Sequence, residues 1–297
     1  MALGCTLSGD DEGDSMTRTR IGLGIAVSLA VALACTSACS SPAKTGSSKA
    51  PADVGDSATA RPAEPETLYQ WSTLSALTIG LYQPAVTVGE IKQRGNTGIG
   101  TFTALDGEMI ELDGVVYQVR ADGSVHESPD ASSSPFAAVT TFSSDRSFEM
   151  TGAANYDALK QAIDAQITGV NDIRVVRIAG HFDYIKTRSV PRQTEPYPPL
   201  AQVTAHQPEF EFRDVDGVLV GVWCPAWVGQ INVPGYHFHF LTADKSGGGH
   251  VLEVTMGKAA AQVDVTPGFN LSVPQTPEFE QVDLAGDYQK QIDAAEK

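Results

Sequence analysis

The chain is poor in cysteine, with only 4 among its 297 residues. Three of these, Cys5, Cys35 and Cys39, precede residue 40, and Cys224 is the single cysteine that follows. If the chain is cleaved at Cys39, the folded part retains one thiol and cannot form an internal disulfide. Its stability must then come from a hydrophobic core or from association with a second copy.

Basic residues are also scarce. The chain has 20 Lys and Arg against 36 Asp and Glu, which gives a formal net charge of −16 and a pI near 4.6. A protein that binds nucleic acid needs basic surface to neutralise phosphates. The composition therefore argues against nucleic acid as a partner, and acidity of this kind mostly reflects solubility.

The apolar run at residues 21–34 is too short to span a bilayer stably. Arg18 and Arg20 precede it and small residues end it, which is the layout of a bacterial secretory signal. Residues 1–15 are acidic and would be an odd beginning for such a signal. We therefore expect the true start of the protein at Met16.

The residues before Cys39 resemble the cleavage box of a bacterial lipoprotein, in which the cysteine becomes the lipidated first residue. Such boxes usually carry Leu where Thr36 stands, and Cys35 is a second candidate. Residues 40–66 have almost no large apolar side chains, so we expect a flexible tether there. Residues 1–39 are thus predicted to be a signal peptide, and the protein to be exported and extracytoplasmic, bound to a membrane only through a lipid anchor.

Three segments have features of helices. Residues 155–167 place apolar side chains on one helical face, with Asn155 as a cap. Residues 87–94 are predicted to form a second, short helix. In residues 68–77 the apolar spacing is compatible with a short helix or with a buried segment, and periodicity does not decide between them.

Strand-like runs rich in Ile, Val, Leu and Tyr fill much of the remaining chain. Asp-Gly pairs at 106–107, 113–114 and 122–123 are preferred two-residue hairpin turns, so we expect a β-meander over residues 100–126. Further strands are expected at 173–182, 184–190, 209–213 and, across an Asp-Gly pair at 216–217, at 218–223.

Sheets with a few separate helices and no regular alternation of strand and helix indicate an α+β fold. We expect mixed and antiparallel β-sheets in two sheet-containing halves. A boundary near residues 168–172 would divide an N-terminal half with the meander, residues 67–170, from a C-terminal metal-binding half, residues 171–297.

The strongest chemical signal lies in residues 237–250. His237 and His239 share one face of a strand because side chains alternate, while the phenylalanines beside them take the other face. Residues 242–249 have the composition of a turn, and His250 then opens a second strand. The hairpin can therefore bring three imidazoles to one point.

Three neutral imidazoles without a fourth protein ligand describe a catalytic zinc site with open positions, whereas a structural zinc is usually closed by cysteine or a fourth residue. A His-x-His pair alone is as often an ordinary polar face of a strand, and the third histidine across the glycine turn is what favours a metal site. His126, His181 and His206 have no partner at ligand spacing, and we expect them at the surface or hydrogen-bonded.

Several long motifs occur in one order along the chain. They are GIGTFTALDGEM at 98–109, VPRQTEPYPP at 190–199, NVPGYHFHFL at 232–241 and GGH at 248–250. These motifs closely resemble the acetolactate decarboxylase family, and the likeness extends from about residue 68 to the C-terminus. It implies decarboxylation of 2-acetolactate to acetoin and CO2, through a metal-stabilised enediolate that is protonated stereospecifically.

The resemblance also implies a set of site residues. His237, His239 and His250 correspond to the ligands of a zinc ion. Glu108, Arg188 and Thr101 match further active-site positions, as does a glutamate close to the C-terminus, for which we choose Glu296, with Glu280 as a substitute. Arg188 would pair with the substrate carboxylate, Glu108 or Glu296 would deliver the proton, and Thr101 would donate a hydrogen bond. A homodimer is suggested by resemblance alone.

Two other functions compete with this hypothesis. A cupin-like, metal-dependent oxygenase also carries His-x-His and a later histidine, but the glutamate expected a few residues after the pair is missing at 242–244. The second is an extracytoplasmic zinc-binding lipoprotein, which often carries a His-rich or acidic loop, and the sequence has none.

Overall fold

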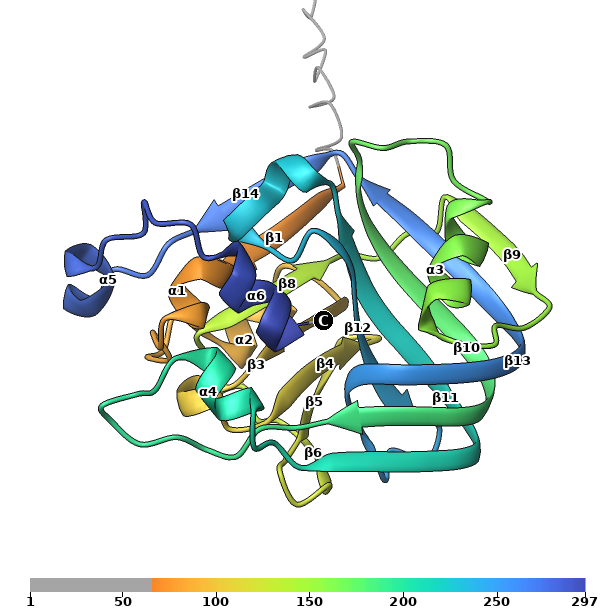
Figure 1. Ribbon diagram of the computed structural model, residues 1–297. Coiled ribbons are helices and arrows are strands. Elements are labelled where there is room, and N and C mark those ends of the chain that lie inside the picture. Colours follow the sequence, from red (N-terminus) through yellow and green to blue (C-terminus); the bar gives the residue numbers. More distant parts are fainter. Residues whose placement is uncertain (1–65, 297) are drawn as a thin grey trace, which may run out of the picture. The chain divides into compact units, whose positions relative to one another are not determined.

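The fold is built on two β-sheets that pack face to face, as the computed structural model of the chain shows for residues 66–296 (Figure 1). Strands are antiparallel except β1 and β14, which pair in parallel, and the helices are short. The α+β class with mixed and antiparallel sheets is confirmed. The signal peptide, Met16, Cys35, Cys39 and the tether up to residue 65 lie outside the described residues.

The first sheet has seven strands and contains the predicted meander. The strands β3 to β6 follow one another in both the sequence and the sheet, so the prediction for residues 100–126 is confirmed. The order across the sheet is β14 (Gly268–Ser272), β1 (Thr67–Trp71), β8 (Phe136–Thr140), β3 (Thr97–Thr101), β4 (Glu108–Leu112), β5 (Val115–Val119) and β6 (Val125–Glu127).

The second sheet has five strands and contains the histidine hairpin. Its order is β10 (Ile173–Arg188), β11 (Glu209–Cys224), β12 (Gly235–Thr242), β13 (Gly248–Thr266) and β9 (Arg146–Met150). Strand β10 also pairs with β13, so β10 to β13 close on one another next to the hairpin. A third, two-stranded sheet joins β2 (Val86–Thr87) and β7 (Ser133–Ser134).

The strands of the second sheet are longer than predicted. The runs at 173–182 and 184–190 form the single strand β10, and those at 209–213 and 218–223 form the single strand β11. The predicted turn at Asp216-Gly217 is therefore wrong. Gly217 lies inside the strand and does not form a turn. A glycine is needed there because the ring of Phe240 occupies the space that a Cβ atom would take.

Of the three Asp-Gly pairs in the meander, the pair at 113–114 forms the predicted two-residue turn. Asp113 and Gly114 both have positive φ and directly join β4 to β5. Asp106 and Gly107 instead follow the 3₁₀ helix η1 (Thr103–Leu105), and the pair at 122–123 lies in the longer connection before β6.

The helices predicted at residues 155–167 and 87–94 form, the first with the predicted Asn155 cap. Asn155 Oδ1 accepts the amide hydrogen of Ala158 at the start of α3 (Tyr156–Asp164), and Thr87 and Glu90 form a capping box on α2 (Val88–Lys92). Residues 68–77 contain both β1 and the start of α1 (Leu74–Thr78). The remaining helices are α4 (Leu200–Thr204), η2 (Ala226–Ile231), α5 (Pro277–Gln281) and α6 (Gln289–Glu296).

Apolar side chains from both sheets meet in one core, which includes Ile110 of β4, Val175 of β10 and Leu241 of β12. On its far side the second sheet packs against α3, and the first packs against α2. A further cluster joins α1, α4 and α6 at the end of the two sheets. The fold is thus layered, with short helices closing one end, where the site lies.

Both sheets cross the expected boundary near residues 168–172. Strand β9 precedes the boundary but belongs to the second sheet, against which α3 also packs. Strand β14 follows the boundary but pairs with β1 of the first sheet. The division into an N-terminal and a C-terminal half stays a prediction. Each of the two sheets combines strands from both sides of the expected boundary.

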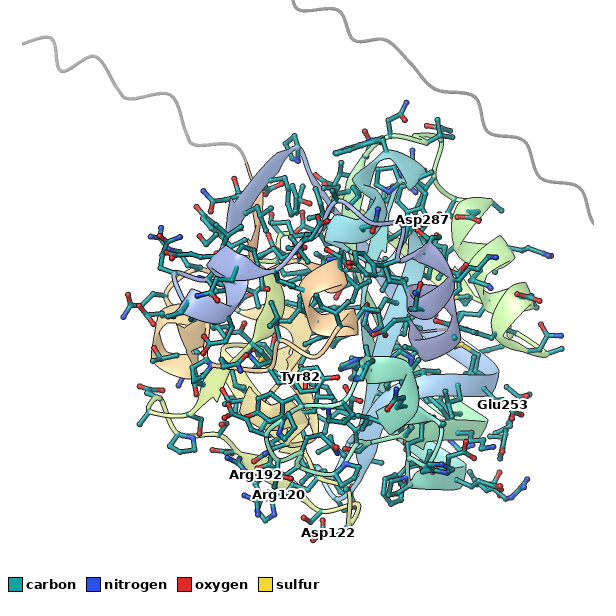
Figure 2. All side chains as sticks on the ribbon, turned by 60° about the vertical axis from the view of Figure 1, so that its left-hand side comes forward. Tyr82, Arg120, Asp122, Arg192, Glu253 and Asp287 are labelled. Atoms are coloured by element: carbon teal, nitrogen blue, oxygen red, sulfur yellow. The ribbon has the colours of Figure 1, made fainter. Side chains whose placement is uncertain are left out.

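The surface is polar over the described residues. Figure 2 shows the charged side chains of Arg120, Asp122 and Glu253 at the periphery, whereas Tyr82 lies inside and is fully buried. No helix in residues 66–296 combines the length and the apolarity needed to cross a bilayer.

Candidate metal centre

The hairpin of β12 and β13 positions the three histidines. His237, His239 and Leu241 point toward the first sheet, while Phe238 and Phe240 pack on the side of α3. The period-two alternation of β12 therefore holds as predicted. His250 stands directly opposite His239 in the pairing of β12 with β13.

Glycine is required immediately before His250. Gly249 has a φ of 127°, a conformation that side-chain-bearing residues rarely adopt, and a Cβ atom there would collide with the carbonyl oxygen of Arg188. The close approach of the two backbones brings Arg188 opposite His250 in the β10–β13 pairing. The glycines of the turn thus serve the geometry of the site.

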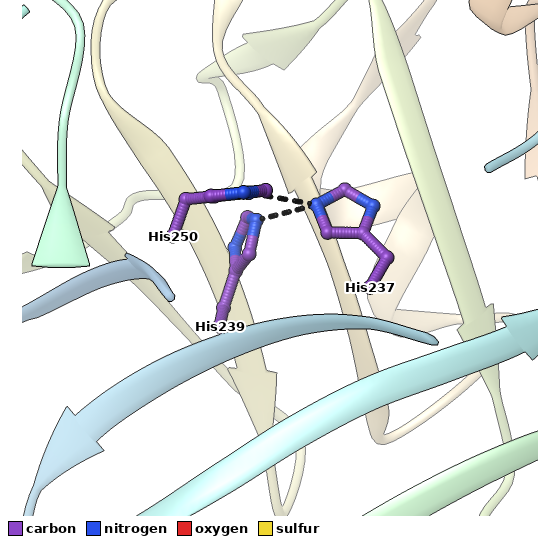
Figure 3. A group of neighbouring side chains, drawn as sticks. All are labelled: His237, His239 and His250. Atoms are coloured by element: carbon purple, nitrogen blue, oxygen red, sulfur yellow. Dashed lines mark hydrogen bonds between the residues drawn. The ribbon is translucent and has the colours of Figure 1, made fainter. Parts of the chain in front are cut away.

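Three imidazole nitrogens converge. His237 Nε2 lies 3.0 Å from His250 Nδ1 and 3.2 Å from His239 Nε2. Figure 3 shows the three rings turned toward one another with these nitrogens innermost. Nitrogens bound tetrahedrally to zinc at about 2.0–2.1 Å stand roughly 3.3 Å apart. The observed separations fit three ligands of one ion.

The environment keeps these imidazoles neutral, as metal ligation requires. Burial, and secondarily the charge of Arg188, lowers the pKa of His237 to about 3, and burial likewise lowers the pKa values of His239 and His250 well below the usual range. His239 Nδ1 donates to the carbonyl oxygen of Met109 at 2.8 Å. Because a carbonyl only accepts, this bond leaves the lone pair on Nε2 of His239.

His237 Nδ1 is buried and has no hydrogen-bond partner among the described residues. Its ring is buried, and its Nε2 faces nitrogens of His239 and His250. The donor set of three imidazole nitrogens, without a thiolate, suits zinc.

The facing sheet contributes Glu108 and Thr101. Both are buried and stand opposite each other in the β3–β4 pairing. Glu108 Oε2 lies 3.6 Å from His239 Nε2. Thr101 Oγ1 donates to the carbonyl oxygen of Gly107 at 2.8 Å, so its hydrogen is already engaged at the turn that precedes Glu108.

Arg188, at the end of β10, is 3% exposed. Its Nη1 donates to Gln207 Oε1 at 2.8 Å, and its Nη2 lies 3.5 Å from Glu296 Oε2. The third donor, Nε, is buried without a hydrogen-bond partner in the described part of the chain. The hydrogen-bond donors of the Arg188 guanidinium are therefore only partly used within the described part of the chain.

Glu296 reaches the site from α6, which packs on α1 and α4 through Ile292 and Ala295. Its Oε2 lies 3.5 Å from His237 Nε2 and 3.8 Å from His250 Nδ1. Glu280 lies on α5 and is exposed, so of the two C-terminal glutamates only Glu296 is at the histidines.

Burial dominates the acidity of both carboxyl groups. It raises the pKa of Glu108 to about 8, with a further rise from the charge of Glu296 and an opposing effect of Arg188. Burial also raises the pKa of Glu296, against the same arginine. These directions describe the site before a cation binds, since a divalent ion would lower both pKa values.

A cavity adjoins His237 and His239. Glu108, Arg188 and Glu296 supply its polar groups. The rest of its wall is mostly apolar and comes from α1, α4, the first-sheet strands β3 and β8, and the neighbouring segments. The apolar lining consists of Leu74, Leu77, Leu105, Phe136, Val190 and Leu200. A small polar molecule with short alkyl groups suits such a cavity.

Comparison with known proteins places this site in a family. The family profile described as alpha-acetolactate decarboxylase matches residues 68–286. Proteins of that name are 40% identical over 232 residues in Methanosarcina mazei, covering 78% of this chain and 81% of that protein, and 37% identical over 237 residues in Brevibacillus brevis, covering 80% and 83%.

A solved structure agrees with these sequence matches. The crystal structure of alpha-acetolactate decarboxylase from Bacillus subtilis strain 168 superposes with a TM-score of 0.76 at 33% identity, covering 77% of this chain and 99% of that chain. The chain belongs to the alpha-acetolactate decarboxylase family. Membership makes it a carboxy-lyase. The profile match includes the three histidines, Glu108 and Arg188, and it ends before Glu296.

Sequence reasoning missed two contributors to the site. Gln207 follows α4 and holds Arg188, and the carbonyl of Met109 fixes the tautomer of His239. Neither has a local signal, because one lies in a loop and the other acts through its backbone. Of the other histidines, His181 is exposed and contacts Asp216 Oδ1 at 3.0 Å, and His126 contacts Ser124.

Replacing His239 by alanine is expected to remove the metal, because only the imidazoles of His237 and His250 remain as ligands. Elemental analysis of the purified protein should find about one zinc per chain in the wild type and almost none in His239→Ala. His181→Ala is the matched control and should retain the full metal content. Full retention in His239→Ala would refute the three-histidine site.

Proposed function

We propose that the protein is a zinc-dependent enzyme that decarboxylates 2-acetolactate to acetoin and CO2. The observation that supports it most directly is the convergence of three buried, neutral imidazoles on one point beside a cavity that also holds Arg188 and two carboxyl groups. Family membership supports the same reaction.

The reaction breaks the bond between the carboxylate carbon and the hydroxyl-bearing carbon. The electron pair of that bond stays on the substrate as an enediolate, CO2 leaves, and one proton is taken up to give acetoin. Zinc held by His237, His239 and His250 would supply Lewis-acid stabilisation of that negative charge. The remaining tasks fall to the protein: to orient the carboxylate, exclude water and deliver the proton to one face.

Arg188 is the group we propose for the substrate carboxylate. Guanidinium binds carboxylates with two parallel hydrogen bonds, and Nε of Arg188 has no partner among residues 66–296 while Nη2 has only the 3.5 Å contact with Glu296. Gln207 fixes Nη1 on the opposite side, so the two freer donors can face the cavity. The carboxylate would then be held and the scissile bond oriented.

Glu108 is the proton donor we propose. Among the described residues it forms no ion pair with a lysine or an arginine, whereas Glu296 contacts Arg188 and is better stabilised as a carboxylate. Burial in the facing sheet favours its protonated form. Thr101 would act on Glu108 indirectly, because its hydroxyl holds the Gly107 carbonyl just before the glutamate.

The two competing functions are less well supported. An iron-dependent oxygenase of the cupin type would use a similar histidine set, but family membership favours a carboxy-lyase. A zinc-delivery lipoprotein must release its metal readily, and here the three ligands are each at least 94% buried and next to an arginine and two carboxyl groups.

Location and assembly are proposals from the sequence alone. We propose export and lipidation at Cys39, and a homodimer. Labelling of producing cells with a radioactive fatty acid should mark the wild type and leave Cys39→Ala unmarked. Cys35→Ala serves as the matched control and should be labelled like the wild type, whereas loss of label in Cys35→Ala alone would move the anchor to Cys35.

Light scattering of the purified chain tests the homodimer, and a monomer mass would show that the dimer proposal is wrong.

The reaction itself is tested with the zinc-loaded protein and racemic 2-acetolactate. We expect acetoin and CO2 in equal amounts, and no turnover after the metal is removed by a chelator. Absence of CO2 release from the fully loaded protein would favour the zinc-binding lipoprotein, and consumption of O2 would favour the oxygenase.

Arg188→Ala is expected to keep its zinc and to lose most of its activity, with kcat/KM reduced by about 100-fold or more, because the substrate carboxylate loses its orientation. Arg213→Ala, which removes an exposed arginine, should leave kcat/KM unchanged. Zinc content and thermal midpoint are measured on both variants to show that they are folded. A fully active Arg188→Ala would disprove the proposed role of Arg188.

A further inference from the structure

Three carboxylates meet far from the histidines, where the described chain begins. Carboxylate oxygens of Glu66, Asp145 and Asp264 lie within 4.8 Å of one another. Glu66 directly precedes β1, Asp145 directly precedes β9, and Asp264 lies near the end of β13. The group thus joins the first strand of one sheet to two strands of the other.

The backbone fixes two of these side chains against each other. The amide hydrogen of Asp145 is donated to the carbonyl of Val263 at 2.9 Å, and Asp145 Oδ2 accepts the amide hydrogen of Val265 at 2.8 Å. Asp145 is therefore hydrogen-bonded to the backbone of both neighbours of Asp264 in the sequence. These bonds continue the pairing of β9 with β13. Like charges placed opposite each other on neighbouring strands are destabilising.

Asp264 is the buried member of the group, with an exposed fraction of 0%. Its Oδ2 accepts the amide hydrogen of Ser143 at 3.1 Å. Its Oδ1 is buried and has no hydrogen-bond partner in the described residues. A buried carboxylate oxygen without a partner is costly, so this atom indicates a missing positive ligand.

No basic side chain compensates the cluster. Within residues 66–296 none of the three carboxylates forms an ion pair with lysine, arginine or histidine. Arg177 acts on Asp264 from a distance, but its guanidinium is bound to Asp113 Oδ1 at 2.7 Å and to Thr97. The negative charge of the cluster therefore lacks a counter-charge from the protein.

We propose that Glu66, Asp145 and Asp264 bind a calcium ion. Hard divalent cations take oxygen ligands, and calcium accepts carboxylates together with backbone carbonyls and waters in a flexible shell of six to eight oxygens. Magnesium is less suited, because it requires a near-ideal octahedron at shorter distances. Zinc would remain at the imidazoles, since this cluster offers neither nitrogen nor sulfur.

A second acidic group in the fold shows what distinguishes this site. His181, Asp183 and Asp214 also lie close together, but all three are exposed. His181 lies 4.0 Å from Asp214 Oδ1 within the group and contacts Asp216 Oδ1 beside it, so the acidic groups already face a histidine. No buried, unpartnered oxygen points to a ligand among these residues, and the group provides a control instead.

The calcium ion would fasten the two sheets where the chain enters the fold. The seven-stranded sheet contributes Glu66 through β1, and the five-stranded sheet contributes Asp145 and Asp264. Such a site is separate from the histidine centre and does not rest on the proposed reaction. Calcium is thus assigned a role in stability and zinc a role in chemistry.

The test uses the whole zinc-loaded chain, dialysed against calcium-free buffer and titrated with calcium chloride in a calorimeter and in thermal unfolding. We expect one calcium per chain and a rise in the thermal midpoint of about 5–11 °C at a hundredfold excess over Kd. Magnesium chloride at the same concentration should give a smaller shift. Zinc content should stay unchanged throughout.

Asp145→Asn is the informative variant, because the side chain is exposed and asparagine removes its charge while keeping an oxygen that can accept the amide hydrogen of Val265. It should unfold at a higher temperature than the wild type without calcium, since repulsion is relieved, and its calcium affinity should fall more than about tenfold. Asp214→Asn should respond to calcium as the wild type does. Wild-type protein without a calcium-dependent shift, or an equal shift in Asp145→Asn, would overturn the proposal.

Discussion

The close approach of three buried imidazole nitrogens is the constraint on which the rest of the structure depends. Two nitrogen lone pairs that face each other across 3.0–3.2 Å repel unless a proton or a cation lies between them, and one metal ion can accept all three lone pairs together. Burial makes protonation of the imidazoles unfavourable, so the arrangement suits three neutral ligands of a metal ion. The neighbouring backbone is arranged to hold these rings in place.

Each sheet provides a different part of the site. The second sheet carries the ligands on β12 and β13 and places Arg188 beside them, because β10 pairs with β13 as well as β11. The first sheet brings Glu108 from the opposite side and fixes His239 through the carbonyl of Met109. Face-to-face packing of the sheets is therefore what brings His239, Arg188 and Glu108 to one cavity.

Buried charge is costly, and the site reduces that cost by pairing. Arg188 is held between Gln207 and Glu296, and α6 closes over the pair through Ile292 and Ala295. A metal ion would add positive charge next to both glutamates and oppose the rise in their pKa values that burial causes. The helices α1 and α4 contribute apolar side chains to the wall of the cavity, and α6 contributes Glu296.

Much of this site could be predicted from local sequence, because the signals were local. Period-two alternation placed His237 and His239 on one face, and the glycine turn brought His250 opposite them. Strand lengths in the second sheet were misjudged, since Asp216-Gly217 has turn composition but serves a close contact with Phe240. Gln207 depends on tertiary packing alone and has no pattern to detect. Glu296 was chosen by resemblance, and only the packing of α6 explains how a residue so near the end of the chain is ordered at the site.

X-ray absorption at the zinc edge of the purified, metal-loaded protein tests the central claim most directly. Three imidazoles predict nitrogen or oxygen scatterers at about 2.0–2.1 Å, with the outer-shell pattern of three histidine rings and no sulfur. A sulfur scatterer near 2.3 Å, or a spectrum that fits fewer than three imidazoles, would contradict the account.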